Sequence, residues 1–278
     1  MWIDAIGQAH ETASGDVRIA SLVPSITELL FDLGLADRLV ARTGFCVHPE
    51  PAVRALAKVG GTKDVKLDRL RALAPTHVVV NIDENRSETV DEIRSFVPHV
   101  ILTHPCAPED NFALYRLLGG IFDRDAQAEA LAAQLRAALD DIRARAWPAR
   151  RLLYAIWQDP WMTVSRATYI SRMLALVNWA TWPDHGDAPA ACADGDCSRP
   201  NAPGERYPTF RWSDSLVRQL DAVLLSTEPY RFTEDHADAL ERQIGKPVLL
   251  VDGEMLSWYG SRAVAGVRYL NGLASAGI

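Results

Sequence analysis

Short apolar runs alternate with longer segments whose apolar residues recur at helical spacing. In the first 120 residues, the short runs predict strands over 17–22, 39–44, 77–81 and 99–103. Between these runs, helical spacing predicts helices over 67–73 and about 88–96. Strands that alternate with helices are typical of a mostly parallel sheet that helices cover on both faces.

A further helix is predicted directly after the first strand, which ends before Pro24. Ser25 and Glu28 have the spacing of a capping box, in which the two side chains satisfy backbone N–H groups of the first turn. Gly34 suits the position just after the last residue of this helix, because glycine adopts the left-handed backbone conformation without strain.

Residues 124–147 form the longest predicted helix, because they contain neither glycine nor proline. Their apolar residues fall at helical spacing, and the helix would span on the order of 30 Å, long enough to join two lobes. After it the pattern repeats, with strands over 152–157, 222–226 and 247–252, helices over 169–177 and 212–220, and a polar insert over 180–207.

The predicted fold class is therefore α/β, with two Rossmann-like lobes joined by a single long helix. The predicted boundaries are 1–123 for the N-terminal lobe, 124–147 for the linking helix and 148–278 for the C-terminal lobe. Open α/β sheets bind ligands at the carboxyl ends of their strands, so a ligand cleft is expected between the lobes. The long helix shows no sustained heptad, which favours a monomer.

Charge and hydropathy exclude several classes of protein. The net charge is −7, and no cluster of lysine and arginine provides the basic surface that a nucleic-acid partner would need. No apolar run approaches the ~18 residues of a membrane span. The N-terminus has no apolar core of a secretory signal, which favours the cytoplasm, or the periplasm if a signal was removed.

Aromatic and charged residues follow the predicted strands and form the candidate ligand site. The rings expected to stack on a bulky ligand are Trp157, Trp161, Trp258 and Tyr259. The groups expected to meet carboxylates or amides of the ligand are Lys63, Asn85, Arg86, Arg231 and Arg262. The expected hydrogen-bond acceptors are Asp159, Asp252 and Glu254. For any one tryptophan, packing in a core is an equally good interpretation.

Three blocks carry a resemblance to a known family: RIASLVPSITELLFDLG (18–34), KVGGTKDVKLDRLRALAPTHVVV (58–80) and VDGEMLSWYGSR (251–262). The chain resembles the helical-backbone metal receptors among class III periplasmic substrate-binding proteins, and within them a cobalamin-binding-protein-like subgroup without a signal peptide. The resemblance implies two α/β lobes, a rigid linking helix and modest closure on a ligand. Its implied ligand is a cobalamin or other corrinoid, then a ferric siderophore or haem.

The same resemblance implies the binding component of an ABC importer, with two departures. Family members usually dock on their permease through one glutamate in each lobe, and Asp68 and Asp214 occupy the matching positions. The missing signal sequence is the second departure. The expected function is non-catalytic binding with no intrinsic cofactor, the cobalt or iron arriving with the ligand. The common hydrolase, zinc-protease and phosphate-loop motifs are absent from the sequence.

A metal-ion site is the alternative, as a sensor or an enzyme. Cys46, His48, His104 and Cys106 form a C-x-H pair and an H-x-C pair after two predicted strands, and two Cys with two His suit tetrahedral zinc. In a second version, His48 or His104 is an axial ligand to the metal of a bound chelate. Cys192 and Cys197 are close enough in the sequence either to form a disulfide or to remain free thiols.

Overall fold

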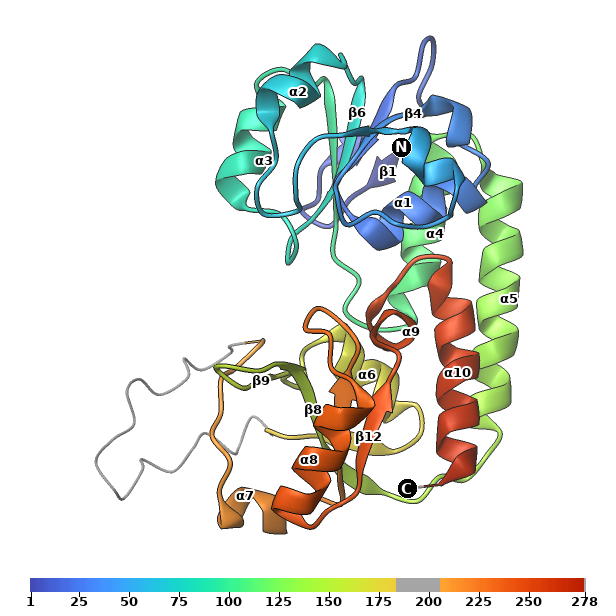
Figure 1. The fold of residues 1–278 in the computed structure, drawn as a ribbon. Coiled ribbons are helices and arrows are strands. Elements are labelled where there is room, and N and C mark those ends of the chain that lie inside the picture. Colours follow the sequence, from blue (N-terminus) through green and yellow to red (C-terminus); the bar gives the residue numbers. More distant parts are fainter. Residues whose placement is uncertain (184–205, 278) are drawn as a thin grey trace. The chain divides into compact units, whose positions relative to one another are not determined.

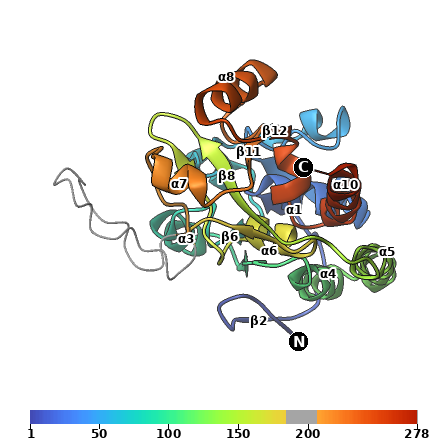
Figure 2. The same ribbon diagram turned by 90° about the horizontal axis from the view of Figure 1, so that it is seen from below.

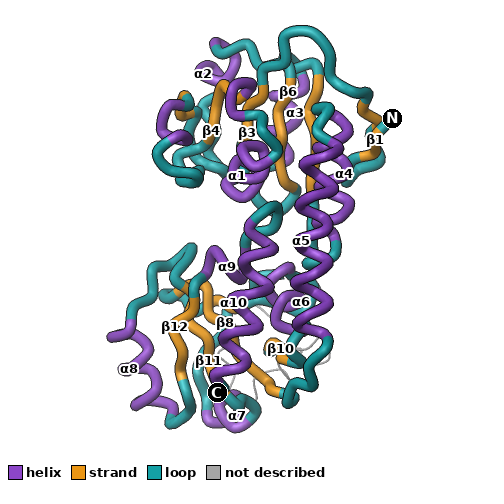
Figure 3. Tube along the Cα trace, turned by 90° about the vertical axis from the view of Figure 1, so that its right-hand side faces the viewer, coloured by secondary structure: helices purple, strands orange, loops and turns teal. Residues whose placement is uncertain are grey.

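A computed structural model describes residues 1–183 and 206–277 and divides them into two compact units. Unit 1 comprises 1–105, 109–136 and 259–264, and unit 2 comprises 106–108, 137–258 and 265–278. Each unit is built around a mostly parallel sheet flanked by helices (Figure 3), which confirms the predicted α/β class with two lobes. Cys192 and Cys197 lie outside the described residues.

Unit 1 contains a five-stranded parallel sheet in the order β5-β4-β3-β6-β7. Its strands are β3 (Ile19–Ser21), β4 (Leu39–Arg42), β5 (Ala57–Lys58), β6 (His77–Asn81) and β7 (His99–Thr103). All five residues of β6 are buried, as expected for the run of valines in this central strand.

Helices cover both faces of this sheet. On one face, α2 (Leu67–Ala72) and α3 (Ser87–Arg94) enclose a core with alternate residues of the strands, among them Val78 and Val80. On the other side lie α1 (Pro24–Asp32) and α4 (Asp110–Ile121), as Figure 1 shows. The small antiparallel pair β1 (Trp2–Ile3) and β2 (Ala9–His10) packs on α4, and two short 3-10 helices, Ala36–Arg38 and Ala52–Ala55, precede β4 and β5.

Unit 2 contains a second five-stranded sheet. Its parallel strands follow the order β10-β8-β11-β12, and β9 pairs with β8 in the antiparallel sense. Their bounds are β8 (Arg150–Trp157), β9 (Met162–Thr163), β10 (Trp179–Thr181), β11 (Ala222–Ser226) and β12 (Val248–Val251).

Helices α7 (Asp214–Arg218) and α8 (Glu234–Ile244) lie on one face of this sheet, and α6 (Tyr169–Ala175) and α10 (Arg262–Ala276) lie on the other (Figure 2). The short helix α9 (Gly253–Ser257) follows β12 directly and packs on α6. Helix α5 (Asp125–Arg143) begins in unit 1 and ends in unit 2, with Leu135, Leu139 and Ile142 buried.

The start of α1 differs from the sequence prediction. The helix begins at Pro24 with Val23 as its N-cap, so Ser25 lies inside the first turn and does not form the expected capping box. Proline is favoured at the first helical position because its missing N–H would have no partner there. Gly34, with φ of 74°, follows the C-cap Leu33, as predicted.

In the described part of the chain, no helix combines the length and the apolar character that crossing a membrane would require.

Candidate functional site

Exposed apolar side chains follow two strands of the unit 1 sheet, β4 and β6. The loop after β4 carries Phe45 and Val47, which are 62% and 40% exposed, and Ile82 directly after β6 is 42% exposed. Removing large apolar side chains from water is favourable, so exposed apolar surface favours binding. Contiguous exposed apolar patches mark binding surfaces. The carboxyl edge of this sheet is also where open α/β sheets bind ligands.

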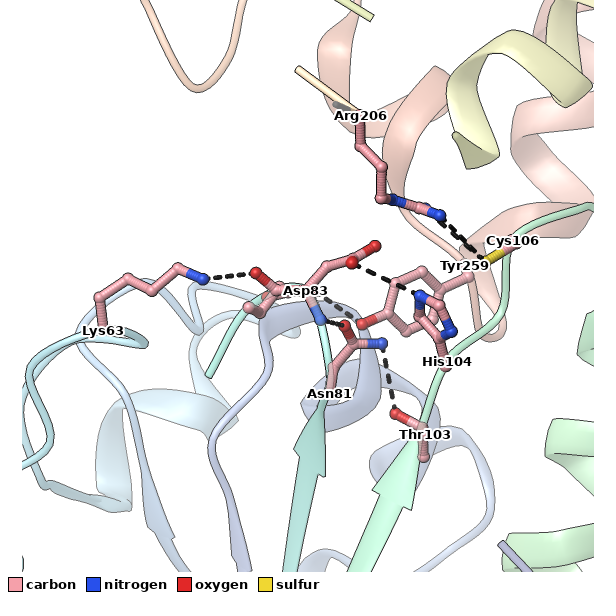
Figure 4. Close-up of polar contacts among 9 residues, drawn as sticks. Lys63, Asn81, Asp83, Thr103, His104, Cys106, Arg206 and Tyr259 are labelled. Carbon is pink, nitrogen blue, oxygen red and sulfur yellow. Dashed lines mark hydrogen bonds and ion pairs between the residues drawn. The ribbon is translucent and has the colours of Figure 1, made fainter. Parts of the chain in front are cut away.

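The loop after β6 is held in place by the side chains of Asn85 and Asn81, of which Figure 4 shows Asn81. The Asn85 carboxamide oxygen accepts from the Asn81 backbone N–H at 2.9 Å, and its amide donates to the carbonyls of Leu22 and Thr62. The Asn81 carboxamide oxygen accepts from the Asp83 backbone N–H at 2.8 Å. Asn85 is buried, so it fixes the loop rather than reaching a ligand, which differs from its predicted role.

Charged groups border the same loop. The Asp83 carboxylate lies 3.4 Å from Nε2 of His104, which follows β7, and the Lys63 ammonium donates to the Asp83 carbonyl (Figure 4). Lys63 and Arg86 are exposed, and His104 is half-buried. These charged side chains lie in loops that follow strands of the same sheet as the exposed apolar residues of unit 1.

The segment Tyr259–Val264 lies in unit 1, although its sequence neighbours on both sides belong to unit 2. The Tyr259 hydroxyl donates to the Glu84 carboxylate at 2.6 Å, and burial, followed by the negative charge of Glu84, raises the pKa of Tyr259. The Arg262 guanidinium donates to both carboxylate oxygens of Glu28, at 2.7 and 2.8 Å. The two residues therefore form structural contacts, whereas the sequence predicted ligand contacts.

In unit 2, one aromatic ring is presented at the end of a strand. Trp157, the last residue of β8, is 40% exposed, and the edge of the Tyr230 ring packs against it at a centroid distance of 5.5 Å. Asp159 and Arg231, in the loops after β8 and β11, are exposed. Trp161 instead stacks on Phe232 at 5.8 Å inside an aromatic cluster, so it belongs to the packing of unit 2.

Glu228, after β11, has a carboxylate that accepts two side-chain hydrogen bonds. It accepts from the indole N–H of Trp258 at 2.6 Å and from the Ser257 hydroxyl at 3.0 Å. Burial raises the pKa of Glu228, these hydrogen bonds lower it, and the charges of Glu254 and Asp252 raise it further. Asp252 also caps α9 by accepting from Met255 N–H at 3.2 Å. Trp258 is buried, which differs from the expected exposed ring.

The four residues of the predicted metal site do not form one. Among residues 1–183 and 206–277, no group of three or more His, Cys, Asp or Glu is placed to hold a metal ion. Cys46 is fully buried and hydrogen-bonded to the hydroxyls of Thr27 and Thr43, and burial raises the pKa of its thiol. The half-buried Cys106 accepts from the Arg206 guanidinium at 3.6 Å. The zinc hypothesis therefore has no geometric support.

Sequence reasoning missed Phe45, Val47 and Ile82 as candidate ligand contacts. Phe45 and Val47 belong to the motif GFCVHP, in which the C-x-H spacing of Cys46 and His48 predicts metal binding rather than apolar contacts. Whether a ring after a strand points inward or outward depends on the loop backbone, so no signal in the sequence separates Phe45 from a core residue.

Two α/β units, each with a largely parallel sheet whose carboxyl edge presents apolar and charged side chains, define a ligand-binding protein of two lobes. The model of the periplasmic binding protein family matches residues 19–192, which is more than half of the chain. The chain belongs to this family, whose members are substrate-binding proteins and typically serve ABC permeases.

Relatives and solved structures agree with this assignment. The chain is 21% identical to the vitamin B12-binding protein of Pectobacterium carotovorum, over 91% of this chain and 86% of the relative. For several other relatives of that name, the match spans only 46% to 63% of the relative's length. The fold is similar to that of the periplasmic vitamin B12 binding protein BtuF of Vibrio cholerae, with a TM-score of 0.74 at 18% identity, covering 93% of this chain and 96% of that one.

A periplasmic haem binding protein from Pseudomonas aeruginosa has the same fold, with a TM-score of 0.73 at 19% identity, covering 94% of this chain and 93% of that one. The family as a whole is periplasmic, and the cytoplasmic location expected from the N-terminus remains only a prediction.

Proposed function

We propose that this chain is a non-catalytic binding protein for a bulky metal-chelating small molecule, a corrinoid first and a ferric siderophore or haem next. The observation that carries the proposal is the set of exposed apolar side chains that follow strands of unit 1, Phe45, Val47 and Ile82. In unit 2, considered by itself, Trp157 is exposed at the end of β8. A flat apolar face of a macrocycle would pack on the aromatic ring of Phe45, because aromatic side chains bury a large area with few rotatable bonds.

The polar residues around these side chains suit the periphery of such a ligand. Lys63, Arg86 and Arg231 are exposed and can donate to carboxylate or amide oxygens, while Asp159 can accept from amide N–H groups. The cobalt or iron would arrive with the ligand. The names of the relatives, which refer to vitamin B12 and to haem, support the chelate class.

The most direct test replaces Phe45. We expect Phe45→Ala to raise the Kd for hydroxocobalamin about tenfold, because the variant loses the burial of one aromatic side chain. Ile3→Ala is the matched control, since Ile3 is 58% exposed in unit 1 but lies on β1. Tryptophan quenching, corrected for absorption by the probe, measures both constants. Equal Kd values for Phe45→Ala and the wild type would contradict the proposed site.

Asp68 and Asp214 are the proposed contacts to an ABC permease. Both are exposed in the first turn of a helix, Asp68 in α2 and Asp214 in α7. A carboxylate there is available to an arginine of a partner. Cysteine crosslinking from positions 68 and 214 to a purified permease tests these contacts, and a lack of crosslinks from both positions would contradict them.

A further inference from the structure

Arg42, the last residue of β4, is a buried cation for which the described residues provide no counter-ion. Arg42 is only 3% exposed, and its guanidinium forms no ion pair with any described residue. A buried charge that lacks a partner of opposite sign costs free energy, which neighbouring carbonyl dipoles only partly offset. An apolar side chain would fill the same space without this cost, so packing alone does not account for a guanidinium at this position.

The side-chain hydrogen bonds of Arg42 to described residues all go to the loop that follows β4. Nε donates to the carbonyl of Val53 at 2.7 Å, and Nη1 donates to the carbonyls of Thr43 and Cys46, both at 3.0 Å. These acceptors span eleven residues of the chain. Only a planar group with several donors can bridge them at once, and arginine is the side chain with that geometry.

The same loop presents the exposed residues of unit 1. Phe45 and Val47 face outward, whereas Cys46 between them is fully buried and accepts from the Thr27 hydroxyl at 3.0 Å. Arg42 therefore holds the backbone carbonyl of Cys46, the residue that stands between Phe45 and Val47 in the sequence. Arg42 and Thr27 fix the inward-facing residue, and this fixes the direction of its neighbours.

A neighbouring glycine loop completes the support beneath Phe45. The Gly44 N–H donates to the Gly60 carbonyl at 2.7 Å, and a Cβ added to Gly61 would lie 3.2 Å from Cε2 of the Phe45 ring. The ring therefore rests against the backbone at Gly61 while most of its surface faces solvent. Such an arrangement exposes a large apolar ring in one fixed orientation before any ligand binds.

We propose that Arg42 is a positioning residue for ligand binding, which holds the Thr43–Cys46 backbone so that Phe45 is presented in its binding orientation. This inference rests on the proposed function, because it gives Phe45 the role of a ligand contact. Preorganisation of this kind increases affinity by removing the cost of ordering the loop when the ligand binds.

A double-mutant cycle tests the role of Arg42, with hydroxocobalamin as the probe. Arg42→Lys keeps the charge but loses the planar fork, and we expect it to raise the Kd about fivefold in the wild-type background. In the Phe45→Ala background we expect less than a twofold further change, because Arg42 acts through Phe45. An equal change in both backgrounds would show that Arg42 does not act through Phe45, and would overturn the inference.

Hydrogen exchange provides a second test that requires neither a ligand nor a variant. In the ligand-free wild-type protein, we expect the amides of Gly44 and Cys46 to exchange as slowly as those of β4. Exchange as fast as in an unstructured loop would overturn the inference even if Arg42→Lys failed to fold. If the wild-type protein bound none of the chelates, the proposed function would fail, whereas the exchange rates of Gly44 and Cys46 would still report on the order of the loop.

Discussion

At the scale of single residues, aromatic and polar side chains near the strand ends differ in whether they are exposed or bound to internal partners. Trp157 and Trp258 were equivalent candidates in the sequence, yet Trp157 is 40% exposed and Trp258 is buried on Glu228. Asn85 and Arg262 are likewise occupied by internal partners, whereas Phe45 is exposed. Residue types indicate which contacts a side chain can form, but the partner of each side chain depends on tertiary contacts that a linear pattern does not contain.

His77, the first residue of β6, should make stability depend on pH. Its buried ring stacks on His99 at 4.6 Å and meets the edge of Phe122. Burial, followed by the positive charges of His99 and His10, lowers the pKa of His77 to about 4 from its ordinary 6.5. The other polar groups of this cluster are the Thr76 hydroxyl, which contacts Nδ1 of His77, and Asp4, which pairs with His10.

Between pH 6.5 and pH 4, unfolded His77 binds a proton that the folded protein excludes. The free energy of unfolding should therefore decrease as the pH falls through this range, by up to about 3 kcal/mol from this residue. Urea unfolding at pH 7 and pH 4.5 measures the change, and His77→Phe, which cannot titrate, should show a smaller one. The same pH dependence in both proteins would contradict this role for His77.

At the scale of helices and strands, the periodicity of apolar residues predicted most of both sheets. Buried strands such as β6 and β11 are continuous apolar runs, and the Gly- and Pro-free segment predicted α5. The ends of helices and strands are harder to predict from the sequence, because they depend on which backbone groups need hydrogen-bond partners. The first turn of α1 begins at Pro24 and not after Ser25, since proline both ends the strand and suits the first helical position.

Two glycines in helices of unit 2 should respond in opposite ways to the same substitution. A Cβ at Gly253, the first residue of α9, would lie 2.4 Å from the Ser226 hydroxyl and 2.9 Å from the Glu228 nitrogen. We expect Gly253→Ala to lower the free energy of unfolding by about 2 kcal/mol or more. A Cβ at Gly272 in α10 would meet no described atom within 4 Å apart from its own helix backbone and chain neighbours, and Gly272→Ala should raise the free energy of unfolding by up to about 1 kcal/mol.

Thermal and urea unfolding of the two variants compare these effects directly. A loss of stability at Gly272 equal to that at Gly253 would show that the close contacts around Gly253 do not determine its tolerance.

At the scale of the whole molecule, alternation of strands and helices predicted the two-lobe α/β class, and three sequence blocks predicted the family. The placement of Tyr259–Val264 in unit 1 was not predictable in this way, since it depends on contacts of Gly260 with Asn111 and Tyr115, far away in the sequence. The sequence does not distinguish among the candidate ligands, because corrinoids, haem and siderophore complexes all need apolar surfaces with a few polar contacts.

The central claim is that the chain binds a metal chelate, and tryptophan fluorescence titration of the wild-type protein tests it most directly. Hydroxocobalamin, cobinamide, haemin and a ferric siderophore are titrated in parallel, with zinc chloride as the bare-ion control and correction for absorption by each probe. We predict saturable quenching by a corrinoid, with a Kd at micromolar concentration or below, and no saturable response to zinc. Saturation by zinc alone, or no saturation by any of the four chelates, would contradict the account.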